Sequence, residues 1–177
     1  MENYPGAPDS VESHGDWDRF PPSTQSALDR ITCMAGEVLK VAAVCASMVD
    51  PEGQLVTSSY GMPVSTALLV SHSFRKHLVI SRRPLVVADG PQDPLVSHNP
   101  VVRDGTVRAC VGMPLQSADG RAIGTLLAMD AKPRWWTDPQ LALMNSLSTM
   151  IVREIELLVA VRRASRYDVS SESFPAE

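Results

Sequence analysis

The stretch from Val107 to Asp130 constrains the fold most, because it consists of two apolar segments joined by a short polar turn. The first half, up to Leu115, and the second half, from Ile123 to Met129, both lack a face suited to water. Between them, Asp119-Gly120 supplies the positive φ that a tight reversal needs. The sequence therefore predicts a central hairpin that other elements cover on both faces.

Composition limits the class of protein. A chain of 177 residues with 44% hydrophobic content is long enough for one core, so one domain with two tails is expected. The net charge of -4 argues against binding to nucleic acid or to an anionic membrane. No apolar run is long enough to span a bilayer, and the N-terminus does not resemble a secretory signal. Three scattered cysteines, Cys33, Cys45 and Cys110, fit reduced thiols, which favours a cytoplasmic location.

Hydrophobic periodicity gives the organisation of the chain. Residues 1–22 are predicted to form a flexible arm, 23–166 the folded domain, and 167–177 a disordered tail. Helices are expected from about Ser23 to Val41, from Ser65 to Ile80 and from Thr137 to Arg166. Strands are expected at 44–50, 54–60, 84–89 and in the two halves of the central hairpin. The stretch 90–104 contains three prolines, so only a turn or two of helix is expected there.

This order predicts an α/β (α+β) fold. A central antiparallel sheet of about five to six strands would carry the terminal helices on one face, with a helix and an irregular segment on the other.

Several motifs in this order resemble those of the GAF domain, a small sensory and regulatory module. They are Pro84–Asp89, the pairs Asp93-Pro94 and Asn99-Pro100, Val107–Leu115, Asp119-Gly120, Ile123–Leu126 and Asp130–Arg134. The resemblance covers about residues 24–162. It implies a domain of signal transduction, such as a bacterial regulator, with a pocket for a small molecule between the sheet and an overlying helix. The ligand itself is not implied, because the fold does not fix the function.

Departures from the family's sequence patterns reduce the number of functions that the resemblance allows. Many relatives place a cysteine after the aromatic residue of the second helix, whereas this chain has Ser73-Phe74-Arg75-Lys76-His77. This difference argues against a covalently bound bilin. The three ungrouped cysteines make a redox enzyme of the free methionine-R-sulfoxide reductase type the weakest alternative. No catalytic or metal-binding motif is present, so we expect neither an enzyme nor a cofactor.

The candidate pocket lies between the central hairpin and the segment Phe74–Asp104, where Gly112 and Gly124 would leave room above the sheet. Arg75 would bind an anionic ligand or pair with a buried carboxylate such as Asp89. Simpler structural roles are a core position for Phe74, a solvated helix end for Arg75 and a packing role for Trp135-Trp136. The candidate ligand-binding residues are Tyr60, Phe74, Arg75, His77, Asp89 and Cys110.

Two functions from different classes remain. In the first, the domain binds a small molecule and signals through its terminal helices to a partner kinase, phosphatase or transcription regulator. In the second, the pocket is filled by side chains and the domain is a ligand-free scaffold for dimerisation or docking. Both include a homodimer through the terminal helices, because the last helix is apolar over more of its surface than one sheet face covers. Ile155 and Leu158 are expected to lie in that contact.

Overall fold

A five-stranded antiparallel sheet forms the centre of the protein. The computed structural model describes residues 21–50 and 53–171, with side chains outside 49–57, 75 and 162–171. The strands lie in the order β2-β1-β5-β4-β3, so β5 is central and β2 is an edge, as predicted. Their bounds are β1 (Ala43–Asp50), β2 (Gly53–Tyr60), β3 (Leu85–Val87), β4 (Ala109–Gln116) and β5 (Ala122–Asp130).

The hairpin of β4 and β5 is built as its sequence requires. Gly120 has a φ of 78°, and its N–H donates to the Ser117 carbonyl at 2.8 Å, which closes the turn. Residues 124–129 of β5 are all buried, so this strand is covered on both faces. The prediction of a central, doubly covered hairpin is confirmed.

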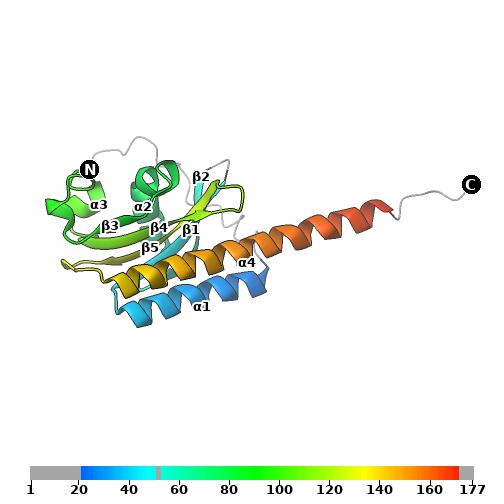
Figure 1. Cartoon of the computed structure of the whole chain (residues 1–177), viewed down its shortest axis with the longest axis horizontal. Helices are drawn as coiled ribbons and strands as arrows, with labels where there is room; N and C mark the ends of the chain where they lie inside the picture. The colour runs from blue at the N-terminus through cyan, green and yellow to red at the C-terminus, as the bar shows by residue number, and fades with distance from the viewer. Residues whose placement is uncertain (1–20, 51–52, 172–177) are drawn as a thin grey trace, which may run out of the picture.

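Helices cover the two faces of the sheet. Figure 1 shows α1 (Pro22–Leu39) and α4 (Asp138–Ser171) side by side on one face. The other face carries α2 (Val64–Arg75), the π-helical turn η2 (Lys76–Ile80), the 3-10 turn η3 (Gly90–Gln92) and α3 (Pro100–Arg103). Two separate clusters of buried apolar side chains result, one on each face. The predicted fold class is confirmed.

The terminal helices differ from the prediction at their ends. Helix α1 begins at Pro22, where the missing N–H of proline has no consequence, and no side chain of Pro21 or Ser23 caps it. Helix α4 continues to Ser171, five residues past the predicted end at Arg166, and projects beyond the sheet (Figure 1). Its 34 residues correspond to about 51 Å at the usual rise. Of the arm predicted at 1–22, residues 1–20 lie outside the described residues, and Pro22 already belongs to α1.

The connection from β5 to α4 also shields the edge strand β3. Trp136 donates from Nε1 to the Val87 carbonyl at 3.0 Å, and the backbone N–H of Arg134 donates to the Ala88 carbonyl at 2.8 Å. Unpaired carbonyls on a sheet edge are thereby satisfied. None of the described helices has the length and apolarity needed to cross a membrane.

Candidate functional site

The face under α2 and η2 is the predicted pocket, and the chain's own side chains fill it. Phe74 from α2, Leu78 from η2, Cys110 from β4 and Leu127 from β5 are all fully buried in one cluster. Phe74 and Cys110, two of the residues proposed to bind a ligand, therefore lie in the same buried cluster. They form a packed core between sheet and helix.

Gly112 and Gly124 do not leave room above the sheet, which corrects the prediction. A Cβ placed on Gly112 would lie 2.7 Å from Cδ1 of Leu78 and 3.0 Å from Cδ2 of Leu127. A Cβ on Gly124 would overlap the carbonyl oxygen of Ser47 on the neighbouring strand. Both glycines are therefore positions of close approach between elements of the protein, and the contact at Gly112 is with a side chain that fills the pocket.

The buried thiols of this face are protonated at neutral pH. Burial, with smaller contributions from Asp93 and Cys45, raises the pKa of the Cys110 thiol to about 12. Burial also raises the pKa of Cys45 to about 11, although a hydrogen bond with Ser71, 3.3 Å from sulfur to oxygen, opposes the shift. Since the thiolate is the reactive form, both groups are poor nucleophiles.

Tyr60 lies on the opposite face, which corrects its assignment to the pocket. It pairs with Val44 across the β1–β2 ladder and packs against the cluster under α1 and α4. A Cβ on Gly36 of α1 would overlap the Tyr60 ring, so the helix approaches the strand closely here. Tyr60 therefore helps to hold α1 on the sheet.

Asp89 pairs with Arg108, so the suggested pairing with Arg75 is not needed. Nε of Arg108 donates to Oδ1 of Asp89 at 2.8 Å, and Nη2 donates to Oδ2 at 3.3 Å. The hydrogen bond from Arg108 lowers the pKa of the Asp89 carboxyl group. The Arg75 side chain lies outside the described part of the structure. His77 is half-buried in η2, and its carbonyl accepts a hydrogen bond from the Ser81 hydroxyl.

The five candidate residues whose side chains are described therefore do not form one site. Only Phe74 and Cys110 share the buried cluster, and sequence reasoning missed Leu78, the residue that occupies the space above Gly112. Its four-residue spacing from Phe74 was visible, but that spacing predicts a shared helical face without saying how deep the side chain reaches. Among the described residues no cluster of three or more metal-binding side chains is present.

Helix α4 carries a second candidate feature, a stripe of incompletely buried apolar side chains. Leu143, Met150 and Leu157 repeat every seven residues; Leu143 is partly buried, whereas Met150 and Leu157 are exposed, Leu157 to 61%. Ile155 and Leu158 are instead buried within the chain, so their predicted place in a contact between copies was wrong. The seven-residue stripe is called the α4 stripe below.

Comparison with known proteins agrees with this architecture. The family model described as "GAF domain" matches residues 23–155. A comparison with curated proteins gave no significant match.

Solved structures share the fold at low sequence identity. The GAF domain of a phosphoenolpyruvate-protein phosphotransferase from Coxiella burnetii is 17% identical with a TM-score of 0.66, and the match covers 81% of this chain and 88% of that one. A GAF domain region of a putative membrane protein from Geobacter sulfurreducens is 15% identical with a TM-score of 0.65, covering 76% and 94%. The type II free methionine-R-sulfoxide reductase from Thermoplasma acidophilum is 12% identical with a TM-score of 0.62, covering 75% and 92%. Because the family model spans most of the folded chain, this protein belongs to the GAF domain family.

Proposed function

We propose that this chain is a non-catalytic regulatory domain of signal transduction that acts through its terminal helices on a partner protein. The observation that carries the proposal is the α4 stripe. A helix that packs only on its own sheet would bury its apolar residues there, whereas α4 also presents apolar side chains outward and extends past the sheet (Figure 1).

A homodimer is the assembly that this stripe favours. The seam of a two-stranded coiled coil has apolar residues at two positions in every seven, and Leu143, Met150 and Leu157 have the spacing of one of these positions. Each α4 would pack against the α4 of a second copy. The projecting end of the pair then offers a surface to a kinase, phosphatase or transcription regulator, the partner classes that this proposal includes.

The packed face under α2 favours the ligand-free version of this function, a scaffold for dimerisation and docking. Leu78 and Phe74 already occupy the space in which a small molecule would lie. The thiols of Cys45 and Cys110, whose pKa values are raised to about 11 and about 12, are protonated at neutral pH, which argues against redox catalysis at this face.

A small-molecule sensor is the second candidate, and one observation favours it. Leu78 belongs to η2, a single π-helical turn, and such turns occur frequently at functional sites. In this version a ligand displaces Leu78 from above Gly112, and the movement of η2 is passed through the sheet to α1 and α4.

Light scattering after size exclusion tests the dimer. The wild type should have twice the 19.2 kDa mass of the chain, and Met150→Glu should give a monomer with unchanged circular dichroism. Asn145→Glu is a matched control, because Asn145 is exposed on the same helix but about 140° around it from Met150. A monomeric wild type, or equal masses for the two variants, would contradict the proposal.

A thermal-shift screen distinguishes the two versions. Small carboxylates, nucleotides and aromatic compounds are tested on the wild type, Leu78→Ala and Arg75→Ala. A sensor should be stabilised by a compound, and loss of that shift in Arg75→Ala would assign the ligand as an anion held by this arginine. If no compound stabilises the wild type or Leu78→Ala, the result favours the ligand-free scaffold.

A further inference from the structure

Trp135 lies on the surface in a connection that is held on both sides, by the backbone N–H of Arg134 and by the indole N–H of Trp136. Its neighbours Arg134 and Trp136 donate hydrogen bonds to the carbonyls of Ala88 and Val87, as described above. The Arg134 guanidinium carbon lies 5.0 Å from the centre of the Trp136 ring, which further restricts that pair. The prediction that both tryptophans serve packing is therefore correct only for Trp136, which is half-buried.

Trp135 itself is 87% exposed. A tryptophan contributes one of the largest apolar surfaces of any side chain, and leaving that surface in water gains nothing for folding. Exposed aromatic residues on a fixed backbone are well suited to binding, because little conformational freedom is lost when a partner contacts them. The exposure of Trp135 therefore points to a contact that the described residues do not make.

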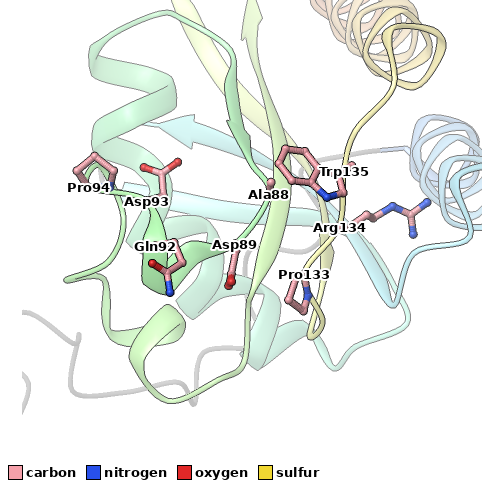
Figure 2. Close-up of a pocket in the computed structure, with 8 residues that line it drawn as sticks. All are labelled: Ala88, Asp89, Gln92, Asp93, Pro94, Pro133, Arg134 and Trp135. Carbon is pink, nitrogen blue, oxygen red and sulfur yellow. The ribbon is translucent and has the colours of Figure 1, made fainter.

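An open groove of about 490 Å³ lies beside this tryptophan. In Figure 2, Pro133, Arg134 and Trp135 come from the connection on one side, and Gln92, Asp93 and Pro94 come from the segment after β3 on the other. Ala88 and Asp89 lie between the two sides. The proline rings and the indole make the groove largely apolar. Its open form suits an extended segment of chain better than a small molecule enclosed on all sides.

The charges of the groove are compensated at all positions except one. Asp89 is paired with Arg108, and Arg134 is paired with Asp130 at 3.4 Å. Asp93 accepts a backbone hydrogen bond from Leu95 at 2.8 Å, but no cation among the described residues pairs with it. The groove therefore combines an indole face with one uncompensated carboxylate, two groups that both attract a cation.

We propose that this groove docks an extended segment of a partner protein that carries an arginine or a lysine. The cationic side chain lies over the indole of Trp135 with its charge directed to Asp93, and apolar neighbours of that residue cover Pro94 and Pro133. The chain's own N-terminal arm is acidic, since residues 1–20 contain five acidic side chains and one basic side chain, Arg19. Arg19 precedes the first residue of α1 by only three positions, at the opposite end of that helix from the Leu39 carbonyl to which Arg134 donates. The site lies apart from the α4 stripe and does not depend on the dimer.

Selection from a random dodecapeptide library on the immobilised full chain tests the proposal. Peptides are first depleted on Trp135→Ala, so that only binders that need this indole remain. The enriched sequences should contain arginine or lysine next to apolar residues or proline. No enrichment over the Trp135→Ala protein, or enrichment of neutral or acidic sequences, would overturn the proposal.

Two matched variants then test the charge. Asp93→Asn keeps the Oδ1 acceptor for the Leu95 N–H, and Asp104→Asn is its control, because Asp104 makes the same kind of turn with Thr106 at 2.8 Å. The best selected peptide should bind Asp93→Asn at least about fivefold more weakly than the wild type and Asp104→Asn with unchanged affinity. Equal affinity of the peptide for both variants would contradict the proposed contact of its cation with Asp93.

The site is located by nuclear magnetic resonance with the same peptide. The indole signal of Trp135, assigned by comparison with Trp135→Phe, and the amides of the non-proline residues within 88–94 should shift on titration. Shifts confined to other regions would contradict the proposal. A change of the Trp135 signal on dilution of the protein without peptide would show that a second copy occupies the groove instead.

Discussion

Leu78 occupies the space directly above Gly112, with its Cδ1 atom 2.7 Å from where a Cβ on that glycine would stand. The two residues come from different layers, η2 and β4, and the missing side chain of one admits the side chain of the other. Because of this contact, the space in which a ligand was predicted to bind is part of the packed core. It also makes Leu78 the residue on which any opening of that face depends.

Leu78→Ala should therefore destabilise the protein markedly. Truncation of a fully buried leucine removes its apolar contacts and leaves a cavity, at a cost of about 2–5 kcal/mol in the free energy of unfolding. Leu69→Ala on α2 is the control, because Leu69 is 64% exposed and should change stability by less than about 0.5 kcal/mol. Denaturant unfolding measures both. A similar small loss for the two variants would mean that Leu78 does not fill the core.

Arg134 should stabilise the junction of α1 with the β5–α4 connection. Its Nη1 atom donates to the Lys40 carbonyl at 2.9 Å, Nη2 donates to the Leu39 carbonyl, and Asp130 lies at 3.4 Å. These donors satisfy carbonyls at the C-terminus of α1, where a positive charge is favourable. Arg134→Ala should cost about 1.5–3 kcal/mol, the range for hydrogen bonds to charged groups.

The conservative and control variants separate geometry from charge at this position. Arg134→Lys keeps the charge but loses the planar fork, so it should recover only part of the stability. Arg121→Ala removes an arginine whose pair with Asp119 is largely exposed, and its loss should stay below about 1 kcal/mol. Full recovery in Arg134→Lys would show that the two carbonyl contacts contribute little.

The three thiols should differ in their reaction with iodoacetamide. Cys33 is exposed on α1, whereas Cys45 and Cys110 are fully buried. Although desolvation and, to a smaller extent, Glu37 raise the pKa of Cys33, its sulfur remains accessible to reagent. Mass spectrometry of the native protein at pH 8 should show one adduct, at Cys33, and three adducts after unfolding. Labelling of Cys110 in the native protein would show that the face under α2 opens readily.

Burial of the thiols should also make the free energy of unfolding depend on pH. The pKa of Cys110 rises from an ordinary value of 9.0 to about 12 on folding, so the folded state holds the proton more tightly. This contribution to stability is present in full below pH 9 and is lost as the pH rises toward 12. Cys110→Ala should therefore lose stability less steeply than the wild type between pH 9 and 11 in denaturant unfolding. Parallel slopes would contradict the assignment.

The layers of the fold could be predicted from sequence because local signals and burial agreed. Asp119-Gly120 indicated the turn, and the absence of a polar face in Ile123–Met129 indicated the central strand. Both signals act within a few residues, so they do not depend on distant partners. The placement of the terminal helices on one face followed from the need to cover that strand, whereas the full strand order was not predicted.

The candidate site could not be predicted, because its geometry depends on contacts between distant segments. The face of β2 on which Tyr60 lies depends on the register with Val44 and on an irregularity between Ala46 and Ser47 in β1. The depth of Leu78 depends on a π-helical turn, whose spacing a 3.6-residue period does not reveal. The exposure of Trp135 depends on the two hydrogen bonds that fix its neighbours to β3.

Two positions on α4 that are separated by one residue, Ile155 and Leu157, should respond in opposite ways to a charge. Ile155 packs in the core under α1 and α4, so Ile155→Glu places a carboxylate among apolar side chains. This variant should unfold the domain or lower its free energy of unfolding by several kcal/mol, about the cost of an unpaired buried charge. Leu157 is exposed in the α4 stripe, so Leu157→Glu should leave the thermal transition of the monomer intact and reduce self-association instead. Circular dichroism melts and light scattering on both variants measure the two effects separately. A folded monomer from Ile155→Glu, together with an unfolded Leu157→Glu, would mean that the two faces of α4 are exchanged relative to the structure described here.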